Sequence, residues 1–128
     1  MLSHGYAFDS CQLPISPIEA NSNAFVRRVL PELNRQNIAV LAMKTLCGAP
    51  AKPVNDKIYT VREGLAYALS LPVASVVTGV ATVAQLRENA AIASHFAPFT
   101  QEEIAALEQR CLSATESDQY QPYRLWMA

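Results

Sequence analysis

Apolar and polar positions change their period along this chain, and the clearest change lies within residues 71–89. β-branched and small apolar residues fill positions 73–78 (VASVVT), a composition typical of a strand buried on both faces. Gly79 ends this run, and from Thr82 the apolar positions recur every three or four residues. The stretch therefore predicts a strand, a turn and a helix, which is one unit of a parallel sheet. Such units place ligand-binding groups in the loop after the strand, here residues 79–81.

The helix after this loop has a predicted start and a predicted core face. Thr82 and Gln85 have capping-box spacing, in which each side chain satisfies a free backbone N–H of the first turn. The apolar positions that follow lie on one side of the helix, which we expect to be buried. These positions are Val83, Leu86, Ala90 and Ala93.

Two further apolar runs predict strands. Residues 7–13 form a short strand candidate that Pro14 ends, and residues 38–43 (IAVLAM) form an uninterrupted apolar run. With the helices described next, the predicted order is strand, helix, strand, helix, strand, helix, helix. Alternation at this spacing favours right-handed βαβ crossovers, so the predicted fold class is α/β with a parallel sheet.

Helices are predicted between these strands and after the last of them. Residues 23–36 have one apolar face, but Pro31 lies inside the pattern and should kink or divide the helix. Capping boxes at Thr60 and Thr100 begin two more helices. Their inward residues are expected to be Val61, Leu65, Ala68 and Leu69 in the first, and Ile104, Leu107 and Cys111 in the second. Residues 46–59 form a long connection, and loops of that length are often functional.

Composition and charge narrow the class of protein. A chain of 128 residues that is 51% hydrophobic and 16% charged fits one globular domain. The formal charge of −1, with both signs mixed, gives no reason to expect nucleic acid or an anionic membrane as partner. No apolar run approaches the roughly 20 residues that span a bilayer. The first residues lack the features of a signal peptide, so we expect a cytoplasmic protein.

The cysteines do not suggest a disulfide framework or a metal site. Cys11, Cys47 and Cys111 are odd in number and far apart, which favours reduced thiols. Their spacing relative to His4 and His95 matches no zinc pattern. No metal ligands are therefore predicted.

An ordered series of motifs resembles the C-terminal half of the aldo/keto reductases over residues 1–112. The motifs are Phe8-Asp9-x-x-Gln12-x-Pro14, Val29-Leu-Pro-Glu-Leu33, Ile38-Ala-Val-Leu-Ala-Met-Lys44, Leu71-Pro72 leading to Thr78-Gly79, Leu86-x-x-Asn89, and Phe99-Thr100-x-x-Glu103. Members of this family are (β/α)₈ TIM barrels that reduce carbonyls with NADPH. The resemblance implies a partial barrel of three parallel βα units, the sixth to the eighth, plus an extra C-terminal helix. Residues 113–128 would be an aromatic tail that packs on this domain or on a partner chain.

The resemblance supplies no catalytic residue. The family's catalytic tyrosine, lysine, aspartate and histidine lie in the first half of the barrel, on units that this sequence does not contain. Tyr6, Lys44 and His95 do not occupy the corresponding motifs. The resemblance therefore implies a truncated protein that is not catalytic alone.

Part of the cofactor cleft does carry over by resemblance. Gln12 matches the glutamine that binds the nicotinamide carboxamide, and Met43 lies where a ring-stacking aromatic residue is usual. Glu88 and Asn89 match the pair that contacts adenine. Lys44 follows a predicted barrel strand directly, at the end where ligands bind.

The remaining part of this implied site is the loop for the adenosine 2′-phosphate, from Gly79 to Thr82. The family usually has a basic residue and a hydroxyl in this loop, whereas the first two residues here are glycine and valine. Binding of NADP(H) is therefore expected to be weak or absent.

Each of these residues also has a structural interpretation. Gln12 would bond neighbouring backbone at a strand end, and Lys44 would extend its amine to solvent. Asn89 would cap or bridge within its own helix. Thr82 would be a helix cap, with phosphate binding at that N-terminus secondary.

A half-barrel leaves one sheet face and two strand edges uncovered. Val40, Ala42 and Val76 are expected on the uncovered inner face. We predict a homodimer through this open barrel face; the alternative is that Tyr120, Tyr123 and Trp126 fold back over it in one chain. A second functional hypothesis is an NADP(H)-dependent reductase of small carbonyl substrates, active only with a complementing N-terminal half.

Overall fold

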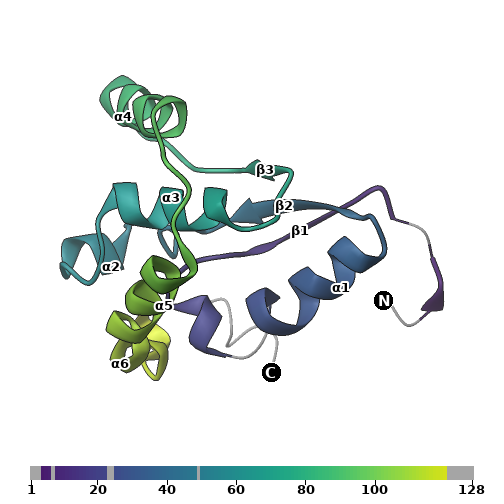
Figure 1. The fold of residues 1–128 in the computed structure, drawn as a ribbon. Helices are drawn as coiled ribbons and strands as arrows, with labels where there is room; N and C mark the ends of the chain where they lie inside the picture. The colour runs from purple at the N-terminus through teal and green to yellow at the C-terminus, as the bar shows by residue number, and fades with distance from the viewer. Residues whose placement is uncertain (1–3, 7, 23–24, 49, 121–128) are drawn as a thin grey trace.

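A three-stranded parallel sheet is the centre of the computed structural model, which describes residues 4–6, 8–22, 25–48 and 50–120. The strands are β1 (Ser10–Pro14), β2 (Ala39–Met43) and β3 (Ser75–Val76), in the order β1-β2-β3 (Figure 1). Helices follow each strand in the chain. The predicted α/β class with a parallel sheet is therefore confirmed.

The two faces of the sheet differ in cover. The register pairs Leu13 with Ala42 and Gln12 with Leu41, so neighbouring residues of β1 face opposite sides. Leu13, Val40 and Ala42 are at most 2% exposed, because helices cover their face. The other face carries Gln12, Leu41 and Met43, and no helix of the described residues covers it.

This arrangement corrects the prediction for Val40, Ala42 and Val76. They lie on the helix-covered face, and Val40 and Ala42 are core residues. The uninterrupted apolar run of β2 has no alternation that would identify its covered side. The sheet therefore has an uncovered face, but Gln12, Leu41 and Met43 line it instead of the predicted residues.

The segment between β1 and β2 is helical in two parts, as the position of Pro31 predicts. A π-helical turn, η3 (Phe25–Val29), leads into the α-helix α1 (Leu30–Arg35), and Pro31 lies in the first turn of α1. Proline is tolerated there because the first N–H groups of a helix have no intrahelical partner. Leu30 and Leu33 point into the core with 3% and 0% exposure.

Two of the three predicted capping boxes are present, at Thr60 and Thr100. Thr60 and Glu63 begin α3 (Val61–Ser70), and Thr100 and Glu103 begin α5 (Gln101–Arg110). The remaining short elements are α2 (Lys52–Asn55), α6 (Leu112–Thr115) and the 3₁₀ helices η2 (Glu19–Ser22) and η4 (Asp118–Tyr120). The long connection 46–59 therefore contains one helical turn.

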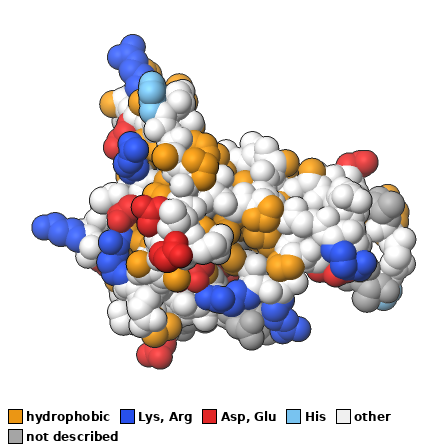
Figure 2. Space-filling view, viewed as in Figure 1, with side chains coloured by type: hydrophobic (Ala, Val, Ile, Leu, Met, Phe, Trp, Pro, Cys, Tyr) orange, Lys and Arg blue, Asp and Glu red, His pale blue; other side chains and the backbone are white. Residues whose placement is uncertain are grey.

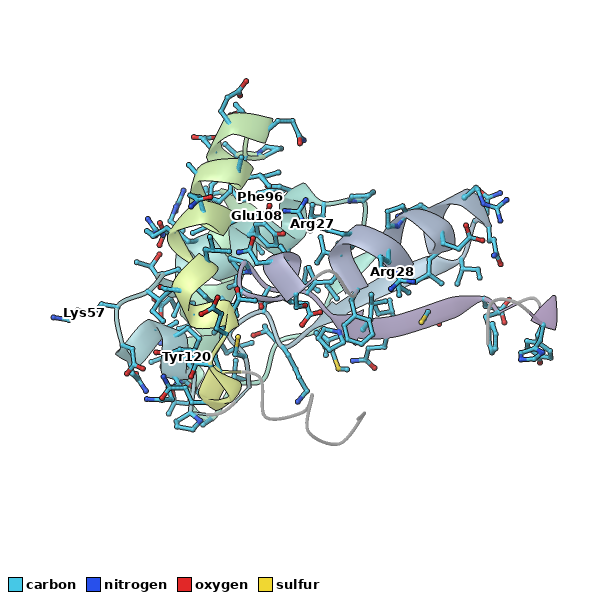
Figure 3. All side chains as sticks on the ribbon, turned by 90° about the horizontal axis from the view of Figure 1, so that it is seen from below. Arg27, Arg28, Lys57, Phe96, Glu108 and Tyr120 are labelled. Atoms are coloured by element: carbon cyan, nitrogen blue, oxygen red, sulfur yellow. The ribbon has the colours of Figure 1, made fainter. Side chains whose placement is uncertain are left out.

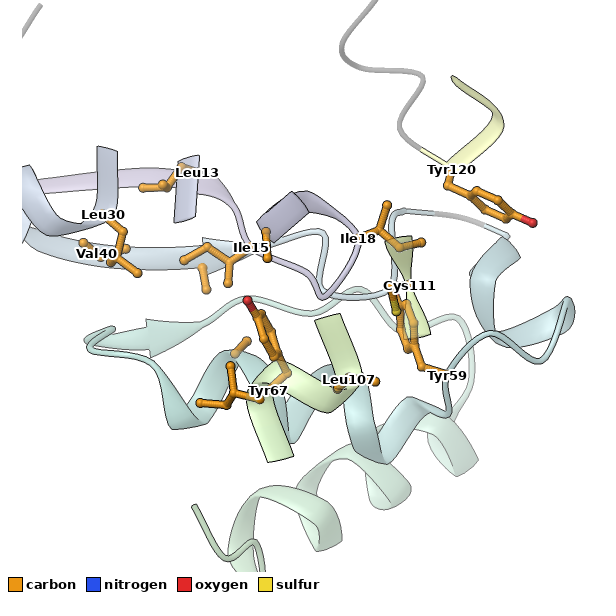
Figure 4. Close-up of a cluster of buried hydrophobic side chains, with 14 of the residues drawn as sticks. Leu13, Ile15, Ile18, Leu30, Val40, Tyr59, Tyr67, Leu107, Cys111 and Tyr120 are labelled. Atoms are coloured by element: carbon orange, nitrogen blue, oxygen red, sulfur yellow. The ribbon is translucent and has the colours of Figure 1, made fainter. Parts of the chain in front are cut away.

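The core lies between the covered face of the sheet and the helices α1, α3 and α5. Figure 4 shows its centre, where Ile15 lies near Tyr67 of α3 and Ile18 lies near Cys111. The predicted inward residues of α5, namely Ile104, Leu107 and Cys111, are all buried. In α3 the prediction was right for Leu65 and Ala68, whereas Val61 and Leu69 are only partly buried. The other buried residues are Gly64, Ala66 and Tyr67.

The strand predicted over 71–78 is much shorter than expected. β3 contains only two residues, and Ser75 and Val77 are exposed. The prediction of a strand buried on both faces was wrong. A parallel strand is buried in this way only when a neighbouring strand lies on each side and both faces are covered. β3 is an edge strand, with β2 as its one partner among the described strands.

The helix α4 (Val83–Ser94) also departs from its predicted packing. Thr82 caps it by accepting from the Gln85 N–H at 3.2 Å, while Gln85 Oε1 accepts from the Ala81 N–H. The predicted core face is exposed, however: Val83 is 63% and Leu86 55% exposed, and Ala90 and Ala93 are exposed as well. Instead, Asn89 and Ile92 are the buried residues. Figure 1 shows α4 projecting beyond the rest of the fold, next to α3.

The structure describes part of each end of the chain. Gly5 has φ +68°, a conformation that glycine commonly adopts where a helical turn ends. Residues 1–3 lie outside the described residues. Tyr120 is 7% exposed and donates to Asp56 Oδ2 at 2.8 Å, so it packs on the C-terminal end of α2 rather than on the open face. Tyr123 and Trp126 lie outside the described residues.

Two further predictions can be compared with the structure. All three cysteines are free, as expected for reduced thiols. Within the described ranges, no helix combines the length and the apolar character needed to span a bilayer.

Candidate functional site

Met43 and Lys44 lie at the carboxyl end of β2, whereas Gln12 lies in the middle of β1 and pairs with Leu41. Gln12 and Met43 lie on the open face, Gln12 exposed and Met43 partly buried. Lys44 follows β2 directly, is exposed and has φ +54°, a left-handed conformation that is uncommon outside glycine. Gln12 and Met43 therefore share the open face, and Lys44 lies at the rim that the carboxyl ends of the strands form.

The loop after β3 has the geometry of a helix start. Gly79, Val80 and Ala81 are exposed, and the hydroxyl of Thr82 is bonded to the first turn of α4. The interpretation of Thr82 as a helix cap is therefore confirmed. The nearest cation in the sequence is Arg87, more than one turn into α4.

A separate cleft of about 580 Å³ lies beside the N-terminal end of α3. It is lined by residues of the α2–α3 connection, the first turn of α3, the middle of α4 and the end of α5. These residues are Val54, Lys57, Ile58, Tyr59, Thr60, Val61, Arg62, Glu63, Glu88 and Arg110. Glu88 is the one predicted site residue among them.

The cleft carries charges of both signs. Arg110 forms an ion pair with Glu63, which also accepts from the backbone N–H of Thr60 at 2.7 Å. Burial raises the pKa of Glu63, but the hydrogen bonds from Arg110 and Thr60 outweigh it and the pKa is lowered. Lys57 and Arg62 have no ion pair among the described residues. The open rim of the cleft therefore has an excess of positive charge.

Asn89 differs from the other predicted site residues because it is buried. Its side chain is 9% exposed on the side of α4 that faces α3, and within the described part of the chain its amide has no hydrogen-bond partner. Buried amides are normally paired, so this group calls for an explanation. The structural interpretation, a cap or bridge within α4, has no supporting hydrogen bond.

The hydroxyl and thiol groups near these sites are engaged or buried. Tyr59 donates to the carbonyl of Thr45 at 3.0 Å. Tyr67 donates to Glu108, and burial together with that carboxylate raises the pKa of Tyr67 above its ordinary value. Burial also raises the pKa of the Cys47 thiol. Neither the cleft nor the open face shows, in the described residues, a nucleophile paired with a base.

The structure brings together only some of the predicted residues. Gln12 and Met43 share the open face with Lys44 at its rim, whereas Glu88 lies in the cleft. No sequence pattern indicated the cleft as a whole, because its residues are dispersed between positions 54 and 110. The capping box of Thr60 and Glu63 was the one local pattern that pointed to part of its wall.

Comparison of this chain with protein-family models, with curated proteins and with solved structures finds no significant match. The described residues contain no group of three or more side chains able to hold a metal ion. The geometry of the open face, the cleft and α4 is therefore the evidence for a function.

Proposed function

We propose that this chain is an aldo/keto reductase-like half-barrel that has no catalysis of its own and assembles with another polypeptide. The observation that carries the proposal is the uncovered side of the fold. It consists of an open sheet face with Gln12, Leu41 and Met43, and of the exposed apolar residues Val83 and Leu86 of α4. Exposed apolar surface costs roughly 25 cal/mol per Å². A closed barrel removes both the open face and the two free edges.

The arrangement of helices supports the same proposal. α1, α3 and α4 follow β1, β2 and β3, and the covered face of the sheet packs on α1 and α3. In a barrel the helices form an outer ring and the other sheet face points inward. The residues of the open face would then belong to the interior and mouth of a barrel, which is completed by strands from elsewhere.

The alternative proposal is an NADP(H)-dependent reductase of carbonyl substrates, active when a complementing half supplies the catalytic tetrad. Two observations favour it. Gln12 on the open face and Lys44 at its rim are exposed, and the buried amide of Asn89 has no hydrogen-bond partner among the described residues. The loop from Gly79 to Thr82 argues against tight binding of NADP(H), because it contains no cation that could pair with a 2′-phosphate.

A titration with NADPH distinguishes the two proposals. For the non-catalytic half-barrel we expect no change of NADPH fluorescence up to millimolar protein and no carbonyl-dependent oxidation of NADPH. Binding at micromolar concentration that is lost in Gln12→Ala, but not in the nearby exposed control Ser10→Ala, would support the alternative. Turnover by the pure chain alone would overturn both, since neither assigns this chain a catalytic group.

A further inference from the structure

The most exposed apolar side chains of the described residues are concentrated at one end of the sheet. Val77 and Val80 precede α4 and are 47% and 44% exposed, and Val83 and Leu86 within α4 are more exposed still. Ala90 and Ala93 continue the row, and we call Val83, Leu86, Ala90 and Ala93 the α4 stripe. Four of the six large apolar residues that are most exposed lie in this one region, so they form a patch rather than scattered contacts. Figure 2 shows apolar side chains on α4 and in the angle below it.

The α4 stripe does not face the helix that α4 packs on. Asn89 and Ile92 are buried against α3, and the stripe lies about a quarter turn away around the helix axis. Asn89 lies on the boundary between these two faces. Its buried amide has no hydrogen-bond partner among the described residues, which is consistent with a neighbour from a second chain.

The two outer strands of the sheet also have unpaired edges. In the order β1-β2-β3, neither β1 nor β3 has a second neighbour among the described strands. On β1, the carbonyl of Asp9 and the N–H of Ile15 bond to β2. In a parallel ladder alternate residues bond to one neighbour, so Ser10 and Gln12 present their backbone groups to the outer edge.

The β3 end and the β1 end of this three-stranded sheet are complementary to each other. The β3 end offers a free strand edge with α4 lying beyond it (Figure 1), and the β1 end offers a free strand edge with α1 on the covered face. A strand that extends this sheet beyond β3 must run parallel to it and carry its helix on that face. The β1 end of this same chain meets both requirements.

We infer that the β1 edge of a second copy pairs with β3 and packs under the α4 stripe, and that a two-fold axis along the strands makes two such junctions. This closes all four edges and encloses both open faces, which face-to-face packing of two sheets would not do. The inference rests on the proposed function, because it takes the half-barrel as the unit that is closed. It specifies the surface and the partner, which that proposal leaves open.

Two variants test the two sides of the junction separately. Leu86→Glu places a charge on the α4 stripe, and Ser10→Pro removes an N–H from the outer edge of β1 without removing a bond to β2. Both sites are exposed, so circular dichroism should match the unaltered chain. Ala91→Glu, at an exposed position of α4 outside the stripe, is the control.

We expect each variant to weaken dimerisation at least tenfold in sedimentation velocity, with the Ala91→Glu chain unaffected. Mixed together, the two variants should form a heterodimer in excess over either homodimer in native mass spectrometry, because one of its two junctions is intact. Dimerisation of Ser10→Pro at full strength would overturn the inference, since it would indicate contact through α4 alone. A monomeric unaltered chain would also overturn the inference. That result would not bear on the expected absence of NADPH turnover, which tests the proposed function separately.

Discussion

Replacing Glu108 by alanine is expected to lower the free energy of unfolding by about 2 to 3 kcal/mol. Glu108 Oε1 accepts from the hydroxyl of Tyr67 at 2.7 Å, and the Tyr67 side chain is fully buried. Loss of the carboxylate leaves that donor without its acceptor, which costs about 1 to 3 kcal/mol. Glu108 Oε2 also pairs with Arg27 at 2.8 Å (Figure 3), but Arg27 is half exposed and this pair adds little. Urea denaturation followed by circular dichroism measures the change.

Two further variants test whether this effect is specific to the contact between Glu108 and Tyr67. Glu116→Ala alters an exposed acid with no hydrogen bond in the described residues, and it should change stability by less than about 0.5 kcal/mol. Tyr67→Phe removes the donor, so combining it with Glu108→Ala should cost less than the sum of the two single changes. Additive effects would show that the two groups do not interact in solution.

Replacing Gly64 by alanine is expected to destabilise the fold by about 1 to 2 kcal/mol. A Cβ at this position would lie 2.8 Å from Leu46 Cδ2, 2.9 Å from Tyr59 Cε2 and 3.0 Å from the Thr45 carbonyl oxygen. Leu46 can rotate, but Tyr59 is 2% exposed and its hydroxyl is bonded to that same carbonyl. Overpacking of this kind costs about 1 to 3 kcal/mol. Alanine regains up to about 1 kcal/mol of helix propensity, which is too little to compensate.

The matched control for Gly64 is Gly79→Ala. No atom lies within 4 Å of a Cβ at Gly79, and its φ is not in the left-handed region. The control should therefore leave the urea midpoint unchanged within error or raise it slightly. An unchanged midpoint for Gly64→Ala would mean that the loop at residues 44–48 packs less tightly on α3 than described.

Local signals predicted the local structure well. The Thr60 and Thr100 capping boxes are formed by side chains a few residues apart, so the sequence contains everything that they need. Pro31 likewise divides its helix through its own covalent structure. The apolar run of β2 was recognised as a strand because buried parallel strands have this composition.

Which surfaces are covered could not be predicted in the same way. The faces of β2 and of α4 depend on what lies beside them, and in this chain the expected neighbours of the α4 stripe are not among the described residues. The predicted core residues Val83 and Leu86 are therefore exposed, while Val40 and Ala42 are buried. Both errors came from assuming which side of an element faces the core.

Only the part of the candidate site that lies at the end of a strand could be predicted from the sequence. Met43 and Lys44 lie at the end of β2, so strand assignment alone placed them at one rim, whereas Gln12 lies in the middle of β1. The cleft combines Lys57 and Arg62 with Glu88 and Arg110, which are distant in the sequence. No local pattern marks such a combination, because it depends on how α3, α4 and α5 pack.

The mass of the unaltered chain in solution tests most directly whether this arc of three βα units is closed by a second copy. One chain has a mass of 14.0 kDa. Size-exclusion chromatography with light scattering should give twice that mass at micromolar concentration, and the Leu86→Glu chain should return to the mass of one. A single 14.0 kDa species for the unaltered chain across the same concentrations would contradict the account.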